Sequence, residues 1–593
     1  MIVRHNRHRM PTINFFPTFP RCLVSLLLLS GMLLPCVSFA QMSSIDTAAF
    51  RMINIKGDTL KGFKGDTVSY QRILGSVVIT HENGVMTCDS AHFYLEQNRV
   101  EAYSNVHLTH PNGTTAQSDY LQYTGADHMA LMNGNVQIRD AKNTLYTESI
   151  QYNLKTKIGN YTDGGTLQSD ETTVSSQLGT YNGTSKQAYF KTDVIITNPK
   201  YIIESKELTY NTASKVIKFL DESHIMGESD TVHTTAGEYD SKNEKAFFTK
   251  RTTLLNKEQV ISGNTLQYDE KTGYGHAKGR VEMAQNAGKN LLFADETEYN
   301  KKTGYGKATG NVVLIDTAQH SRLLSGMIEY NDHSKFMLAT LHPKLITLTD
   351  KDSLYMRADT MMLIRNRDLG VLKYTSITQG EKKKKQTFQA YNLLYADSTF
   401  ISNDSLRLII ANHQVRMFSD SMQAVCDSLS YSQIDSSFRL FRSPIIWNRN
   451  QQGTADTIWI HTERNTLEQV NLRANSFLVS QNASTCYDQV SGNYIDAYFK
   501  DGEMDWAHVN QNAESLYYAK DDKGAYIGVN KAECSMMRIY FVNKELDHIV
   551  MLENPKGTFY PIDRIADKEK YLSAFKLFPE RRPASKAEIM NNE

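Results

Sequence analysis

The 593-residue chain has no excess of charge of either sign, because 65 basic residues are balanced by 65 acidic ones. A nucleic-acid-binding protein needs a clustered basic face, so this balance gives no support for that class of partner. Proline is rare, with 12 residues, while 40% of the chain is hydrophobic. This composition is typical of a folded protein.

Long hydrophobic runs are also scarce. One apolar run, Cys22–Pro35, follows four arginines and precedes the small residues of Ser38-Phe39-Ala40. That order predicts a cleavable signal peptide over residues 1–40, whereas a lipoprotein site at Cys36 would want small residues before it. No later run reaches the 18 apolar residues of a transmembrane helix. We therefore expect an exported chain that is soluble or held peripherally at a membrane.

Motifs for catalysis and cofactor binding are missing. The sequence contains no Gly-x-Ser-x-Gly elbow, no phosphate loop ending in Gly-Lys-Ser/Thr, no His-Glu-x-x-His and no Cys-x-x-Cys. The 17 histidines lack the spacing of metal ligands. Gly273, Gly275 and Gly279 resemble a dinucleotide loop, but their near copy one repeat later indicates a hairpin turn instead. We predict no catalytic residues, no cofactor and no metal site.

What the sequence does contain is a repeat with a period of 29 to 31 residues. A tyrosine column runs through it at Tyr123, Tyr152, Tyr181, Tyr210, Tyr239, Tyr268, Tyr299 and Tyr330. Fifteen residues after each tyrosine comes an apolar side chain, in order Ile138, Leu167, Ile196, Ile225, Leu254, Met283, Leu314 and Leu345. Five residues before each tyrosine the side chain is small, in order Ser118, Thr147, Ser176, Ser205, Thr234, Gly263, Ala294 and Ser325. Self-similarity of this kind is typical of a stacked repeat array.

Each repeat has an internal period of two. Around Tyr152 the chain reads Glu148-Ser-Ile-Gln-Tyr152, with one parity mainly apolar and the other mainly polar. Such alternation predicts half-buried β-strands. A second strand follows, usually behind a glycine and a polar residue, and glycine-rich segments such as residues 271–279 and 302–310 predict the turn between the two strands. The fold class is therefore all-β, an elongated two-sheet array.

The pattern divides the chain into segments. After the signal peptide we expect a leader over residues 41–74 and regular repeats over residues 75–365. Residues 366–400, which include the run Lys382–Lys385, predict an exposed insertion or loop, because like charges repel and stay solvated. Less regular repeats follow over residues 401–560. The tail, residues 561–593, is expected to hold one short helix and to end loosely.

Four cysteines remain after signal-peptide removal, at Cys88, Cys426, Cys486 and Cys534. In an oxidising compartment they permit three disulfide pairings, and the sequence does not choose among them. Cys88 and Cys426 stand in the column that serine, alanine and glycine fill in other repeats. This position favours small packed residues over disulfides.

An acidic column follows the small residues. Its members are Asp89, Asp119, Glu148, Asp295, Asp359, Asp404, Asp427 and Asp456. Oxygen ligands in a row could bind calcium. Lys206 occupies the same column, however, and argues against a continuous metal ladder. We expect polar side chains that cap a turn.

The apolar columns allow two interpretations. In one, the two sheets close on a packed core, which is the commoner outcome for aliphatic and tyrosine side chains. In the other, the sheets form an open V whose apolar inner surface holds acyl chains. Periodicity does not separate the two, because tyrosine, with its apolar body and polar tip, suits both.

The repeated phrases resemble the OstA/LptA family of lipopolysaccharide-transport proteins. They are Ala-Asp-x-x-x-Tyr-(Asn/Asp), as in Ala294–Asn300, and Lys-Ala-x-Gly-Asn-Val-x-Leu, as in residues 307–314. The likeness spans about residues 70–360, with weaker echoes to about residue 540. The resemblance implies an open β-jellyroll, also called a β-taco, that carries lipid A acyl chains through the periplasm without catalysis.

The resemblance also implies partners and a lining. Lipopolysaccharide would be the cargo, similar transport proteins would stack on the free strand edges, and association with the outer membrane stays open. The chain departs from the family in having many more repeats than a single bridge protein, and in lacking a large barrel after residue 560. The positions carried over as lipid-binding lining are Leu121, Tyr123, Val136, Ile138, Ile150, Tyr152, Leu208, Tyr210, Leu266, Tyr268, Val281, Met283, Val312 and Leu314.

Two rival hypotheses remain. The first is an exported structural or adhesive β-solenoid with a closed core that binds protein or glycan. The second is a polysaccharide lyase or hydrolase on a parallel β-helix, which would want a cluster of carboxylates and basic residues off the regular columns. We find no such cluster, which disfavours the enzyme, and the resemblance makes the carrier the preferred hypothesis.

Overall fold

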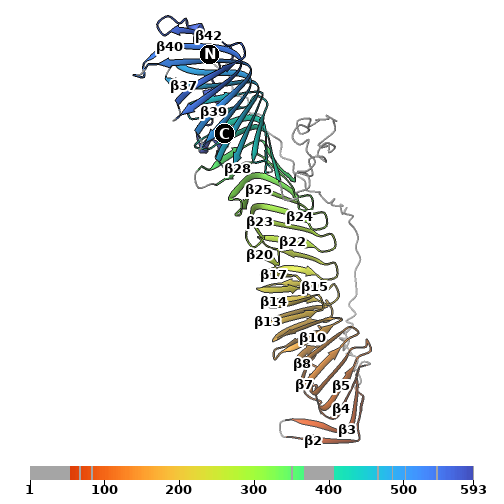
Figure 1. Cartoon of the computed structure of the whole chain (residues 1–593). Helices are drawn as coiled ribbons and strands as arrows, with labels where there is room; N and C mark the ends of the chain where they lie inside the picture. The colour runs from red at the N-terminus through yellow and green to blue at the C-terminus, as the bar shows by residue number, and fades with distance from the viewer. Residues whose placement is uncertain are drawn as a thin grey trace, which may run out of the picture. The chain divides into compact units, whose positions relative to one another are not determined.

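The computed structural model describes residues 54–365 and 407–591, except residues 66–67, 82–83, 349–351, 434, 464–465, 484, 501–502, 522 and 543–544. The predicted signal peptide, the start of the leader and the predicted loop at residues 366–400 lie outside the described residues. Figure 1 shows the described strands stacked in chain order.

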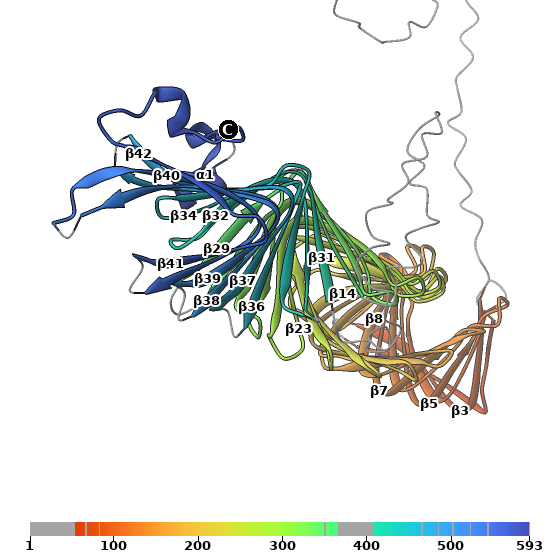
Figure 2. The same cartoon turned by 45° about the horizontal axis from the view of Figure 1, so that its top comes forward.

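The strands belong to one 42-stranded sheet, and the pairings between described strands are antiparallel. A parallel β-helix, the scaffold of the lyase hypothesis, is therefore wrong. The all-β prediction is confirmed. In Figure 2 the longer strands bend at a corner, so that the sheet has two arms.

We name the arms by the side chains on their inner faces. The tyrosine arm carries the tyrosine column, and the aliphatic arm carries the apolar residues fifteen positions later. Eighteen strands run through the corner from one arm to the other: β3 (Ser69–His81), β4 (Gly84–Tyr94), β5 (Arg99–Thr109), β6 (Thr115–Thr124), β7 (Met129–Arg139), β8 (Asn143–Asn153), β13 (Gln187–Asn198), β14 (Tyr201–Asn211), β23 (Tyr274–Gln285), β24 (Asn290–Asn300), β25 (Tyr305–Asp316), β26 (Ser321–Asn331), β31 (Arg407–Phe418), β32 (Gln423–Ser432), β37 (Thr466–Ala483), β38 (Cys486–Lys500), β39 (Glu503–Lys520) and β40 (Tyr526–Val542).

The remaining strands lie in one arm only. In the tyrosine arm these are β2 (Thr59–Lys64), β9 (Ile158–Tyr161), β12 (Leu178–Asn182), β15 (Val216–Phe219), β18 (Gly237–Asp240), β19 (Lys245–Phe248), β22 (Thr265–Asp269), β27 (Phe336–Thr340), β30 (Thr360–Arg365), β33 (Ser437–Phe441), β36 (Thr457–Glu463) and β41 (Glu545–Leu552). In the aliphatic arm they are β1 (Asn54–Lys56), β10 (Gly165–Ser169), β11 (Thr172–Ser176), β16 (Ser223–Gly227), β17 (Asp230–Thr234), β20 (Thr252–Asn256), β21 (Gln259–Gly263), β28 (Lys344–Thr347), β29 (Leu354–Arg357), β34 (Ile445–Asn448), β35 (Gln451–Thr454) and β42 (Lys556–Pro561).

A pair of left-handed residues makes the bend in β7, and β3, β5, β13, β23 and β25 have similar pairs. Gly134 and Asn135 have φ values of 77° and 48°, and the β7–β8 register shifts across them, between Asn133 and Val136. Glycine reaches this conformation without strain. A Cβ on Gly134 would also lie 2.5 Å from Oδ2 of Asp119, so the corner leaves no room for a side chain.

The acidic column supports the same corners. Asn135 Nδ2 donates a hydrogen bond of 2.8 Å to Asp119 Oδ2, and Asn311 donates one of the same length to Asp295. These aspartates therefore accept hydrogen bonds from the next strand. Among the described residues, no group of three histidine, cysteine or acidic side chains is placed to hold a metal ion.

The small-residue column lies on the strand that faces each corner. Ser205 Oγ donates to the carbonyl of Glu207, and Thr147 Oγ1 donates to that of Ser149, each over 3.1 Å. A short polar side chain thus satisfies a main-chain carbonyl at the bend, as buried carbonyls require. Larger side chains would not fit this inner corner.

The glycine-rich segments are only partly turns. The turn predicted at residues 271–279 ends at Gly273, and β23 already begins at Tyr274; the copy at residues 302–310 ends likewise at Gly304. Gly279 and Gly310 are corner residues with φ values of 76° and 73°. The prediction of a nine-residue turn is wrong because the second half of each phrase encodes a strand and its corner.

The sheet crosses the irregular region of the sequence without a break. β30 pairs with β31 from Thr360↔Asn412 to Arg365↔Arg407, and β29 pairs with the other half of β31. The regular and the less regular repeats therefore share one sheet. The array also starts before residue 75, because β1 and β2 pair with β3.

The tail lies on the outer face of the aliphatic arm. It contains 3₁₀ turns at Asp567–Lys570 and Pro579–Arg581 and the helix α1 (Lys586–Met590), whose Ile589 is fully buried. The expectation of a loose end does not hold for the described tail, which packs on the sheet to its last turn. No helix among the described residues has the length and apolar character that a bilayer crossing requires.

Candidate functional site

The inner faces of the two arms form one apolar surface. In the tyrosine arm, Leu121 and Tyr123 face inward from β6, while Gln122 between them faces outward. In the aliphatic arm, Val136 and Ile138 do the same on β7. Two clusters of buried apolar side chains fill the interior, one from Ile73 to Leu266 and one from Met283 to Ile539.

All fourteen predicted lining residues avoid full exposure, and their burial follows their distance from the corner. Nine are buried, namely Leu121, Val136, Ile150, Leu208, Tyr210, Leu266, Val281, Met283 and Val312. Five are half-buried, namely Tyr123, Ile138, Tyr152, Tyr268 and Leu314. Most of the buried ones lie near the corner, and the half-buried ones lie nearer to the tips of the arms. The interior is therefore sealed along the corner and more accessible at the tips.

The tyrosine column packs against small residues on neighbouring strands. Tyr299 lies between Gly275 and Gly306 in the register, and Tyr330 lies beside Gly306 on the other side. A Cβ on Gly306 would lie 2.1 Å from Cζ of Tyr330, so this ring occupies the space above the glycine. Tyr299 and Tyr330 stack with centroids 6.2 Å apart. These stacked aromatic rings form part of the inner face of the tyrosine arm.

These tyrosines stay neutral. Burial raises the pKa of Tyr299 to about 12, with Asp332 as a further cause, and burial also raises the pKa of Tyr268. A neutral phenol combines an apolar ring with a hydroxyl that donates a hydrogen bond. The half-buried tyrosines can therefore contact an apolar chain with the ring and a polar group with the hydroxyl.

The second half of the sheet contains a small, partly open hollow with a cavity volume of about 40 Å³. Its lining comes from both arms, with Ile446 and Leu478 on the aliphatic side and Val470, Ala497 and Phe499 on the tyrosine side. Its lining is apolar, but its volume is far below that of a ligand pocket, so this hollow by itself does not hold a guest. The sequence did not single out this region, because its repeats depart from the 29-residue period.

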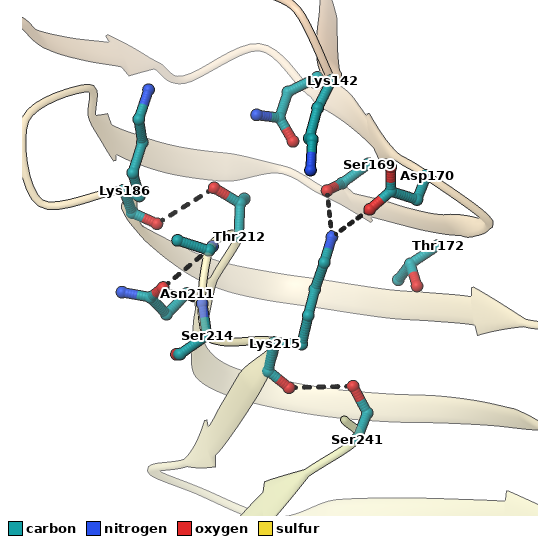
Figure 3. A network of polar contacts seen from close by, with 12 residues as sticks. Lys142, Ser169, Asp170, Thr172, Lys186, Asn211, Thr212, Ser214, Lys215 and Ser241 are labelled. Atoms are coloured by element: carbon teal, nitrogen blue, oxygen red, sulfur yellow. Dashed lines mark hydrogen bonds and ion pairs between the residues drawn. The ribbon is translucent and has the colours of Figure 1, made fainter. Parts of the chain in front are cut away.

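The tips of the arms carry polar hairpins that meet over part of the interior. Figure 3 shows Lys215, from the β14–β15 hairpin of the tyrosine arm, reaching Ser169 and Asp170 in the β10–β11 hairpin of the aliphatic arm. The distances from its Nζ are 3.1 Å to Ser169 Oγ and 2.7 Å to Asp170 Oδ2. Sequence reasoning missed this contact, because both residues read as ordinary turn residues.

The cysteines do not take part in disulfides. All four are free, and Cys88, Cys426 and Cys534 are buried. Cys88 Sγ donates a hydrogen bond of 3.3 Å to the carbonyl of Ser90, as serine and threonine do at the other corners. The expectation of small packed residues for Cys88 and Cys426 is confirmed.

Comparison with known proteins gives one family match. Residues 51–206 match the family model described as OstA-like protein. No curated protein matches the chain. Among solved structures, LptH from Pseudomonas aeruginosa, the LptA homologous periplasmic component of the conserved lipopolysaccharide transport device, is 12% identical, with 28% of this chain and 80% of that chain covered. Its TM-score of 0.09 is too low to carry an argument about this chain.

Proposed function

We propose that this chain, which is OstA-like over residues 51–206, is a non-catalytic carrier that holds the lipid A acyl chains of lipopolysaccharide between its two arms. We place it in the periplasm, reached by the predicted signal peptide, where it would pass its cargo toward the outer membrane. The fourteen lining residues are proposed as acyl-chain contacts.

The observation that carries this proposal is the continuous apolar interior with half-buried side chains toward the tips. Tyr123, Tyr268 and Leu314 lie on inner faces yet remain partly exposed. A water-facing apolar surface is costly, at about 25 cal/mol per Å², unless a ligand covers it. Because the strands continue in register from repeat to repeat, an acyl chain could move along the surface without losing its apolar contacts.

The sheet ends provide the means to contact partners. Among the described strands, β2 pairs only with β3 at the first end, and β41 and β42 both pair with β40 at the other. Their outer main-chain groups can accept a strand from another protein. We propose that other lipopolysaccharide-transport proteins, or further copies of this chain, add to these edges and extend the apolar surface.

A structural or adhesive protein with a closed core remains the second candidate. The observation that favours it is the stretch around β13 to β15, where Phe190, Ile196 and Tyr210 are each no more than 2% exposed. A core closed in this manner needs no ligand. The two candidates make different predictions for the half-buried positions outside this stretch.

Site-specific photo-crosslinking in cells separates the candidates. A photoreactive residue at Tyr299 or Leu314 faces inward, whereas one at Glu298, the neighbour of Tyr299, faces outward and is exposed. We expect lipopolysaccharide to be captured at Tyr299 and Leu314 and not at Glu298. Capture of protein or glycan alone, or equal capture at Tyr299 and Glu298, would contradict the carrier proposal.

A further inference from the structure

Three ion pairs join the tips of the two arms over one stretch of the sheet. Each links a lysine in a hairpin of one arm to a carboxylate in a hairpin of the other. The pairs are Lys186–Asp140 at 3.6 Å, Lys215–Asp170 at 2.7 Å and Lys200–Glu244 at 2.7 Å. Lys186 and Lys215 extend from the tyrosine arm, whereas Lys200 extends from the aliphatic arm.

The pairs are successive in the stack. Asp140, Asp170 and Lys200 occupy consecutive hairpins of the aliphatic arm, and Lys186, Lys215 and Glu244 occupy consecutive hairpins of the tyrosine arm. Each ion pair therefore joins one hairpin of the tyrosine arm to one hairpin of the aliphatic arm, which we call a rung. The three rungs are neighbours in the stack.

Hydrogen bonds also join consecutive hairpins at the tip of the tyrosine arm. Thr212 Oγ1 donates to the carbonyl of Lys186 over 3.4 Å, and Ser241 Oγ donates to the carbonyl of Lys215 over 2.9 Å (Figure 3). Each hairpin is thus bonded to the previous one through the main chain of Lys186 or Lys215. Both lysines cross the mouth, by which we mean the gap between the tips of the two arms. Lys186 and Lys215 therefore extend from hairpins whose main chain is held in place.

Aromatic contact beneath the ion pairs completes the closure. Tyr201, at the tip of the aliphatic arm, packs edge to face against Tyr239 of the tyrosine arm, with centroids 5.5 Å apart. Below them Tyr210 is 1% exposed and Ile196 is 0% exposed. Other members of the same inward columns within this stretch, Tyr181, Ile225 and Tyr239, are half-buried. The most deeply buried members of these columns, Leu167, Ile196 and Tyr210, therefore lie within the ion-paired stretch.

We infer that these three pairs form a latch that closes the mouth over residues 140–244 and must open before an acyl chain can occupy or pass this stretch. The inference rests on the proposed function for the nature of the cargo. The geometry of the latch does not depend on that function. Exposed ion pairs are individually weak and screened by salt, so a latch made of them opens reversibly.

The latch can be tested by measuring the distance across the mouth. Spin labels at K142C and T184C, in a C486S background, report the separation of facing hairpins by double electron–electron resonance. The latch-free variant carries Lys186→Gln, Lys200→Gln and Lys215→Gln. The control is Lys206→Gln, because the Lys206–Glu222 pair, 2.6 Å long, lies at the corner of the sheet and does not join the tips of the arms.

The wild type should give one short, narrow distance distribution at low salt. The triple variant should give a longer and broader one, and 1 M salt should shift the wild type in the same direction, while Lys206→Gln should match the wild type. We expect the open population to rise about tenfold, the combined effect of three exposed pairs of ordinary strength. Exchange of Lys200 and Glu244 should leave the wild-type distance unchanged. An unchanged distance in the triple variant and at high salt would overturn the latch.

A second readout separates the latch from the proposed function. A fluorescent fatty acid serves as the acyl probe, and its association rate is measured with the wild type, the triple variant and Lys206→Gln. Faster uptake by the triple variant alone supports the latch as a gate. Uptake at equal rates by all three contradicts the gate and leaves the carrier proposal standing. Failure of the probe to bind any of them would count against the carrier proposal, while the spin-label distances still decide whether the latch exists.

Discussion

At each corner of the sheet, the backbone conformation restricts which residue can be present. The first corner residue of β7, Gly134, needs a positive φ and leaves no space for a Cβ beside Asp119. The second, Asn135, tolerates positive φ and also donates to that aspartate. Both residues of the Gly-Asn pair therefore contact the aspartate of the acidic column.

We predict that Gly134→Ala destabilises the fold by about 1 to 2 kcal/mol, the cost of a left-handed conformation for a residue with a Cβ. The urea midpoint of unfolding measures this. Gly62→Ala is the matched control, because a Cβ at Gly62 meets nothing within 4 Å. Equal midpoints for the two variants would refute the corner argument.

Burial controls the reactivity of the cysteines. Burial raises the pKa of Cys88 to about 11 and also raises the pKa of Cys426 and Cys534. Because only the thiolate reacts, its fraction at pH 8 is small at these positions. Cys486 is half-buried and is the most accessible of the four.

We therefore expect a thiol reagent at pH 8 to label Cys486 first in the native mature protein. Labelling of Cys88 should accelerate as the pH rises toward the raised pKa, and all four cysteines should react once the protein is unfolded without a reductant. Mass spectrometry of the labelled peptides gives the order. Cysteines that stay unlabelled in the unfolded, unreduced protein would indicate disulfides and contradict the four free thiols.

At the scale of elements, the tail is fixed by glutamines on the outer face of the aliphatic arm. Gln489, which is fully buried, accepts from Leu572 N at 2.8 Å and donates to Lys570 O at 2.9 Å. Gln452 makes the same two bonds with Phe578 N and Lys576 O, at 2.9 and 2.8 Å. Each glutamine side chain supplies the tail main chain with the donor and the acceptor that a neighbouring strand would otherwise provide.

The far end of the tail is held by ionic contacts. Arg416 Nη2 lies 2.5 Å from Glu588 Oε1, and Arg357 Nη1 donates to the carbonyl of Glu588 over 3.1 Å. The tail thus passes from β38 back to β29 and joins strands that are distant in the sequence. It covers buried apolar side chains on this outer face, including Phe477 and Trp447.

Gln489→Ala should release the middle of the tail, because the buried amide and carbonyl that it satisfies would lose their partner, at a cost of about 1 to 3 kcal/mol. Limited proteolysis should cut the tail at least several times faster than in the wild type. Gln151→Ala, at an exposed outward position, should not change the rate. A tail that remains resistant in Gln489→Ala would show that the apolar contacts alone hold it.

At the scale of the molecule, the two halves of the sequence depend on pairing across residues 366–406. β30 and β31 match over six residue pairs, and β29 adds three more with β31. Met356 and Met417, which face each other in that pairing, belong to one buried cluster with Ile328 and Leu429. The halves are therefore joined by both hydrogen bonds and core packing.

We predict that the chain stays associated after a cut between Lys382 and Lys385. A specific protease site placed there should give two fragments that co-elute under native conditions, because main-chain pairing and the shared core hold them together. Denaturant should separate them. Fragments that part after native cleavage would show that the halves are independent units.

The sequence by itself determined the local structure of this protein. The period-two alternation around Tyr152 predicted strands, and the 29-residue period predicted stacked repeats, since both can be read along the chain. The glycines at the corners were read as turns between strands, because a local pattern does not tell a bend within a strand from a turn. The same columns identified which side chains face inward, because alternation fixes the face once one member is known.

Only the tertiary structure decided how far the two arms stand apart. Lys215 and Asp170 belong to different hairpins, and nothing in either turn indicates that they meet across the mouth. Gln489 looks like any outward polar residue until the tail lies over it. Such contacts join segments about 45 to 80 residues apart and depend on the angle at every corner between them, which no local pattern encodes.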